Sequence, residues 1–74
     1  MKYATPEIVA KLREKFSVGS RVVATIHDPH VDIINCCLGT VQLVDDTGTV
    51  HIKFDNGIEL GAVYGIDKVE KSWW

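Results

Sequence analysis

The residues with the richest metal and redox chemistry lie in one short segment between positions 27 and 37. It contains the ligand types that zinc prefers: His27, Asp28, His30, Asp32, Cys36 and Cys37. Zinc sites usually take two cysteines separated by two residues, or two histidines separated by three to five residues. Here His27 and His30 are separated by two residues and the cysteines are adjacent, so the spacing differs from both patterns. Adjacent cysteines rarely chelate one ion well, and a disulfide between neighbours is strained. We therefore predict a polar loop with two free thiols and no metal, which fits a reducing cytoplasm.

The paired carboxylate and amide side chains lie where turns are expected. Asp45-Asp46 and Asp55-Asn56 precede glycines between apolar runs, and Asp and Asn are residues that turns favour. The chain has no phosphate-binding loop, dinucleotide fingerprint or nucleophile elbow, and nothing pairs a base with a nucleophile. These patterns favour a protein that is not an enzyme and holds no cofactor.

Other side chains are better suited to binding. Arginine recognises phosphate or carboxylate with two parallel hydrogen bonds, and a tyrosine ring stacks on a planar ligand. We predict that ligand binding uses Arg21, His51, Lys53, Tyr64 and Asp67. The alternative is that these residues are ordinary surface charges and an aromatic at the edge of the core.

Two exposed indoles at the end of the sequence would form an adhesive patch, so Trp73 and Trp74 are predicted to fold back on the helix or to cover a neighbouring subunit.

One helix and five strands must position these residues. Thr5 is a suitable N-cap, Pro6 fits the first helical position, and an apolar stripe ends at Phe16, which predicts a helix over residues 5–17. From Arg21 the period becomes two, which predicts strands at 21–26, 39–44, 49–54, 58–63 and 66–70, with a loop at 27–38. Asn56-Gly57 is the strongest hairpin signal, typical of a primed turn.

These elements favour a mainly β fold with one N-terminal helix. Five short strands joined by tight turns predict a strongly bent sheet, and closing it into a small five-stranded SH3-like barrel would remove exposed edges. The helix would pack over one open end. An OB-type barrel is the weaker alternative because it usually needs a longer chain. We expect a single domain over residues 1–74: the helix at 5–17, the barrel at 21–71 and a tail at 72–74.

Composition narrows the possible partners. The 74 residues are 46% hydrophobic and 24% charged, with a net charge of −2, and the pI is about 5.8. A small acidic domain is a poor candidate for binding nucleic acid through phosphate neutralisation. No apolar run approaches the roughly 18 residues of a membrane span, and no secretory signal opens the sequence. We therefore expect a cytoplasmic protein.

Several segments in order resemble a small bacterial family of unknown function. They are Leu12-Arg13-Glu14, Gly19-Ser20-Arg21-Val22, Leu38-Gly39-Thr40-Val41, Val44-Asp45-Asp46-Thr47-Gly48, His51-Ile52-Lys53-Phe54-Asp55-Asn56-Gly57 and Tyr64-Gly65-Ile66-Asp67. The resemblance covers about residues 8 to 71. The family occurs in phages, prophages and mobile elements of Firmicutes, so the resemblance implies a phage-type origin and an SH3-like fold but no established activity.

Three functions follow as expectations. The first is a non-enzymatic homo-oligomer that sequesters a small anionic, nucleotide-like ligand and so counters host defence. The second is an adaptor that grips a host or phage protein through its loops or an open strand edge. The third is weak nucleic-acid binding, which the acidic balance disfavours.

Overall fold

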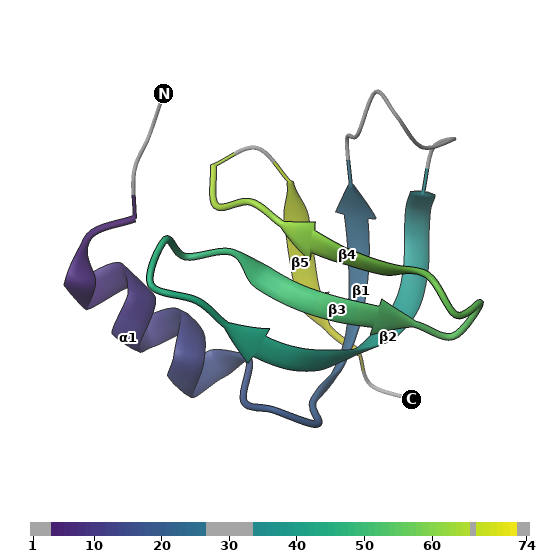
Figure 1. Cartoon of the computed structure of the whole chain (residues 1–74), viewed down its shortest axis with the longest axis horizontal. Helices are drawn as coiled ribbons and strands as arrows, with labels where there is room; N and C mark the ends of the chain where they lie inside the picture. Colours follow the sequence, from purple (N-terminus) through teal and green to yellow (C-terminus); the bar gives the residue numbers. More distant parts are fainter. Residues whose placement is uncertain (1–3, 27–33, 66, 73–74) are drawn as a thin grey trace.

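The computed structural model describes residues 4–26, 34–65 and 67–72, and these residues form one helix and five strands. In chain order they are α1 (Pro6–Lys15), β1 (Arg21–Ile26), β2 (Ile34–Val44), β3 (Val50–Phe54), β4 (Glu59–Ala62) and β5 (Lys68–Lys71) (Figure 1). The prediction of a mainly β fold with a short N-terminal helix is confirmed.

Helix α1 begins at the cap that the sequence predicts. The Thr5 Oγ1 accepts a hydrogen bond from the N–H of Ile8 at 3.3 Å, and Pro6 occupies the first turn. The helix ends at Lys15 because Phe16 leaves helical geometry, with φ −113° and ψ 65°. This is two residues earlier than expected. Nowhere in residues 4–26, 34–65 and 67–72 is there a helix long and apolar enough to cross a membrane.

The strands form one antiparallel sheet in the order β4-β3-β2-β1-β5. Within the described residues β4 and β5 are its two edges and do not pair with each other, so the sheet is open and the closed barrel that we expected is not seen. Both edge strands have only four residues. Hydrogen bonds within the β4–β5 turn occupy the backbone groups of Val63, which follows β4. The N–H of Asp67 donates to the carbonyl of Val63 at 2.9 Å, and the N–H of Val63 donates to the Asp67 carboxylate at 2.9 Å.

Strand β2 is longer than predicted and is shared by two parts of the sheet. We expected a loop as far as residue 38, but the strand begins at Ile34. Its first part pairs with β1 up to Thr40, and its second part pairs with β3 from Gly39 to Val44. The strand curves between these two partners (Figure 1). The prediction failed because pairing with β1, rather than a local alternating pattern, makes residues 34–38 a strand.

The point where β2 changes partners requires a residue without a side chain. A Cβ at Gly39 would lie 2.5 Å from Cγ2 of Ile52 and 3.0 Å from the carbonyl oxygen of Lys53. The glycine therefore lets β3 approach closely while β1 still pairs on the other side.

The β3–β4 hairpin has a three-residue loop, Asp55-Asn56-Gly57, at the place where the sequence predicts a hairpin. The N–H of Phe54 donates to the carbonyl of Ile58 at 2.8 Å, and the N–H of Gly57 donates to the carbonyl of Phe54 at 2.9 Å. Gly57 has a φ of 92°, and Gly48 takes the same place in the β2–β3 hairpin with a φ of 83°. Glycine is usual at this last position of a three-residue hairpin loop, because the position requires a positive φ.

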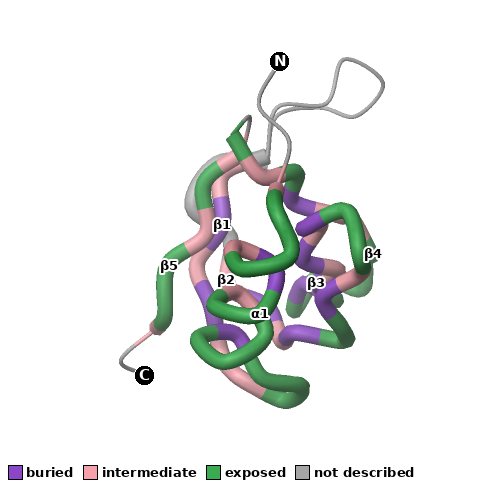
Figure 2. Tube along the Cα trace, turned by 90° about the vertical axis from the view of Figure 1, so that its left-hand side faces the viewer, coloured by how far each residue is buried: buried purple, intermediate pink, exposed green. Residues whose placement is uncertain are grey.

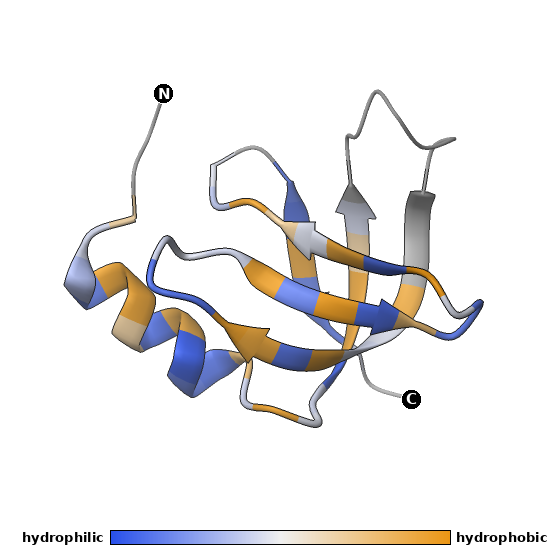
Figure 3. Ribbon diagram, in the orientation of Figure 1, coloured by the Kyte–Doolittle hydropathy of each residue, from blue (hydrophilic) through white to orange (hydrophobic). Residues whose placement is uncertain are grey.

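The core lies between the inner face of the bent sheet and α1. Buried and exposed residues alternate along β3, as the pattern of Val50, Ile52 and Phe54 predicts (Figures 2 and 3). The largest fully buried side chains are Phe54, Ile52, Val22 and Val41. From α1, Val9 and Phe16 are buried. This packing fixes the inner and outer faces of each strand, and so places the candidate binding residues.

Candidate functional site

The structure divides the predicted binding residues between two places. Arg21 and Lys53 each lie opposite Thr40 in the strand register, and His51 is two residues from Lys53 on the same strand. These three basic residues therefore share the outer face of the sheet, the face turned away from the core. Tyr64 and Asp67 instead lie on the turn between β4 and β5.

Arg21 is already engaged by a carboxylate. Its Nη1 and Nη2 donate to the two carboxylate oxygens of Asp55 at 2.8 and 2.6 Å, and Nη1 also donates to Oγ1 of Thr40 at 3.0 Å. These hydrogen bonds, with the charge attraction, hold the pKa of Asp55 below its usual value and raise the pKa of Arg21. A ligand anion would have to displace Asp55 to reach this guanidinium.

His51 is also paired. Its Nε2 lies 2.8 Å from Oδ2 of Asp45, and the other carboxylate oxygen accepts from the hydroxyl of Thr47 at 2.6 Å, the N–H of Thr47 at 2.9 Å and the N–H of Thr49 at 3.1 Å. Hydrogen bonds from the Thr47 hydroxyl, from His51 and from the backbone hold the pKa of Asp45 well below its usual range, although burial opposes this. Asp45 therefore stays charged and ties the β2–β3 turn to β3.

The third basic residue of the outer face, Lys53, is exposed and lies opposite Glu59 of β4. Each of the three basic residues thus has a carboxylate partner or neighbour. Since these carboxylates already offset the positive charge, the outer face is poorly prepared to bind a small anion.

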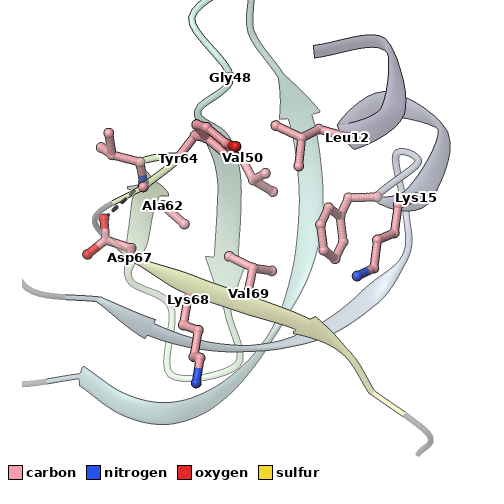
Figure 4. A pocket seen from close by; sticks show the side chains of 12 residues that line it. Leu12, Lys15, Gly48, Val50, Ala62, Tyr64, Asp67, Lys68 and Val69 are labelled. Atoms are coloured by element: carbon pink, nitrogen blue, oxygen red, sulfur yellow. Dashed lines mark hydrogen bonds between the residues drawn. The ribbon is translucent and has the colours of Figure 1, made fainter. Parts of the chain in front are cut away.

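The other predicted residues line a hollow between α1 and the β4–β5 turn. This space, which we call the Tyr64 hollow, has a volume of about 270 Å³ (Figure 4). Its apolar walls come from the helix and from the inner faces of three strands: Leu12, Phe16, Val50, Ala62 and Val69. The half-buried ring of Tyr64 forms a further wall. The hollow exists because the open sheet leaves a gap between β4 and β5 that α1 covers on one side only.

The polar groups of the hollow lie at its rim. Asp67 accepts the N–H of Val63 and so shapes the turn (Figure 4). Lys15 lies at the end of α1, with its Nζ 5.2 Å from the centre of the Phe16 ring. Lys68 opens β5 and is exposed. The ammonium group of Lys15 and the carboxylate of Asp67 therefore border an apolar space, whereas the side chain of Lys68 points away from it, on the side of β5 opposite Val69 (Figure 4).

Sequence reasoning found Tyr64 and Asp67 but missed Lys15. Lys15 stands directly before the last apolar residue of the helical stripe. This position does not signal a site by itself. Only the packing of α1 against the sheet brings Lys15 to the hollow.

Two predictions fall outside the described residues. Trp73 and Trp74, the expected oligomer contact, are not described, and neither are His27, Asp28, His30 and Asp32 of the cysteine-containing segment. Across residues 4–26, 34–65 and 67–72 no three His, Cys, Asp or Glu residues cluster as metal ligands would.

The fold and the hollow define a small, mainly β domain with an open five-stranded sheet, a covering helix and an apolar space with Lys15 at its rim. The profile of the family described as Domain of unknown function (DUF4314) matches residues 5–72, so the chain belongs to that family. The resemblance to a domain of unknown function is thereby confirmed over nearly the whole chain. A search of curated proteins and a search of solved structures each returned no match.

Proposed function

We propose that the domain is a non-enzymatic binding module that takes a small anion with a planar, apolar body, such as a nucleotide, in the Tyr64 hollow. The observation that carries this proposal is the combination of an apolar space with Tyr64 as a wall and Lys15 at the rim. Its volume of about 270 Å³ is close to the lower end of the usual range for ligand sites, roughly 300–1,000 Å³. A ring would fill the space and leave its charged group at Lys15.

The proposal differs from the sequence-based one in the residues that meet the charge. Lys15 replaces Arg21, His51 and Lys53 as the group that meets the charge, because these outer-face side chains already have acidic neighbours. Tyr64 keeps the stacking role that we predicted for it. Asp67 holds the turn rather than the ligand. Since Asp67 is the only carboxylate among the described lining residues, and the N–H of Val63 occupies one of its oxygens, we include no catalytic step.

The biological setting that we propose follows from the resemblance to phage-encoded domains. Binding without turnover would withdraw a nucleotide signal from the cytoplasm of an infected cell and so counter host defence. An oligomer held together through Trp73 and Trp74 remains part of this proposal. An SH3-like relationship of the open sheet also remains a proposal, supported by the strand order and the covering helix.

Thermal melting of the full chain with a ligand panel tests the function. AMP and a cyclic dinucleotide serve as planar anions, and adenosine serves as the uncharged control. We expect the anions to raise the melting temperature, and Tyr64→Ala and Lys15→Glu each to weaken binding at least about tenfold. The matched control is Lys11→Glu, an exposed helix residue outside the hollow.

Two results would overturn this function. One is a panel in which neither anion stabilises the chain. The other is stabilisation that persists unchanged in both Tyr64→Ala and Lys15→Glu.

A second candidate is a protein-interaction adaptor. The open sheet favours it, because an unpaired edge strand can accept an extended segment of another protein. An adaptor of this kind would respond to none of the nucleotides in the panel.

A further inference from the structure

Strand β4 has a short free edge whose backbone groups can be assigned. The hydrogen bond from Phe54 to Ile58 makes these two residues a bonded pair at the start of the β3–β4 ladder. Bonded and non-bonded pairs alternate along an antiparallel ladder, so Leu60 points its N–H and carbonyl toward β3, whereas Glu59 and Gly61 point theirs outward. Val63 follows the same alternation, and its outward groups are the ones that bind Asp67.

Among the residues that the structure describes, the edge is therefore open at Glu59 and Gly61. Because these residues flank Leu60, two antiparallel copies of β4 can pair with a two-fold axis at Leu60. Each Glu59 would then exchange both backbone hydrogen bonds with the partner's Gly61. We infer that β4 is a self-association edge through which two copies of the chain form one continuous sheet, with Leu60 opposite the partner's Leu60.

The side chains on the outer face complement this pairing. Gly61 lies opposite His51, and a Cβ at Gly61 would lie 3.7 Å from Cε1 and 3.7 Å from Nδ1 of that imidazole. A hollow of about 340 Å³ lies here, lined in part by Gln42, Leu43 and His51. The nearest atom to that Cβ would be Cγ2 of Thr49, at 2.7 Å, so Thr49 fills the space beside Gly61. In the two-fold pairing the partner's Glu59 lies opposite Gly61, on the face that carries His51.

The charges along this row also agree with the pairing. Asp45 takes Nε2 of His51, which leaves Nδ1 as the ring nitrogen on the side of Gly61 and of the partner's Glu59. Lys53 lies on the same face, opposite Glu59 of its own chain. The two-fold axis places Glu59 opposite the partner's Gly61 and not opposite the partner's Glu59, so the two like charges do not face each other.

Pairing of β4 with a second copy's β5 is geometrically disfavoured. The N–H of Ser72 donates to the carbonyl of Arg21, so Val69 and Lys71 carry the outward groups of β5 by the same alternation. Val69 packs against the core, whereas Glu59 lies on the outer face. Residues that lie opposite each other in a ladder point to the same face of the sheet. Pairing β4 of one copy with β5 of another would therefore make the outer face of the first sheet continuous with the core face of the second.

Sedimentation of the full chain over a range of concentrations tests the inference. We expect a reversible dimer, and Glu59→Lys should weaken it at least about tenfold because it sets a cation against His51 and Lys53. The matched control is Glu70→Lys, the same charge change on an exposed residue of the other edge strand, which should leave the dimer unchanged.

A cross-link checks the register. Directly opposite residues of a non-bonded pair have Cα atoms about 4.5 Å apart, which suits a disulfide. Leu60→Cys should therefore give a covalent dimer on mild oxidation, with the bridge mapped to position 60, whereas Glu70→Cys should not. A chain that stays monomeric at every concentration, or a dimer equally stable in Glu59→Lys with no bridge at position 60, would overturn the inference.

This assembly goes beyond the proposed ligand binding and does not depend on it. Neither Glu59 nor Gly61 lines the Tyr64 hollow. The nucleotide response of the Glu59→Lys variant therefore reports on the hollow alone, and its sedimentation reports on the edge alone.

Discussion

Substituting Gly48 by alanine separates the two reasons for a glycine in the β2–β3 turn. The first is conformation: at a φ of 83° an alanine costs about 1 kcal/mol. The second is space, because a Cβ at Gly48 would lie 2.5 Å from Cβ of Ala4, 3.5 Å from Cβ of Tyr64 and 3.6 Å from Cδ1 of Leu12. Forcing an atom into such a gap costs a further 1–3 kcal/mol, roughly. We expect Gly48→Ala to lower the free energy of unfolding by about 2–4 kcal/mol.

Gly57 supplies the matched control. It has the same position in the next hairpin and a φ of 92°, but a Cβ there meets nothing within 4 Å. Gly57→Ala should therefore show the conformational cost alone, about 1 kcal/mol. Urea unfolding of both variants measures the difference, and each kcal/mol should lower the melting temperature by roughly 4–8 °C in a domain of this size. Equal losses in the two variants would refute the packing argument.

Two further predictions concern the charged pairs. Asp45→Ala should lower the free energy of unfolding at neutral pH by about 1–2 kcal/mol, because four hydrogen bonds are lost but the carboxylate is 34% exposed and water replaces part of them. The pKa of Asp45 is lowered in the folded state, so its contribution is complete above about pH 4 and is lost as the pH falls further. Urea unfolding at a series of pH values should show a shallower acid loss in the variant, and identical pH profiles would contradict this. Arg21→Ala should change stability little, since Arg21 and Asp55 are both well exposed, and a large loss that persists in high salt would show that the pair does more than we infer.

Local signals in the sequence predicted most of the elements. The cap at Thr5 and Pro6 and the alternation around Ile52 each depend on residues close in sequence, and the structure has both. Strand β1 has the bounds that we predicted. The start of β2 at Ile34 was missed because its pairing with β1 is a tertiary contact.

The candidate site was less predictable than the fold. The types of Tyr64 and Asp67 suggested binding, but Lys15 is almost fifty positions earlier and only α1 packing brings it near them. Arg21 was predicted as a ligand residue from its type alone. Its partner Asp55 was read as a turn residue, and sequence reasoning did not foresee that the same carboxylate would neutralise the guanidinium.

The pairing of β1 with β5 has a consequence for synthesis on the ribosome. Val22 lies opposite Lys71, about fifty residues later in the chain. At roughly 5–20 residues per second, the ribosome needs several seconds to supply the second partner of β1. During that interval β1 can pair with β2, but its other edge stays open to any extended segment nearby. The nascent chain therefore passes through a stage in which the six-residue strand β1, rather than the four-residue strand β5, forms an edge of the sheet, and this edge is covered only when β5 emerges.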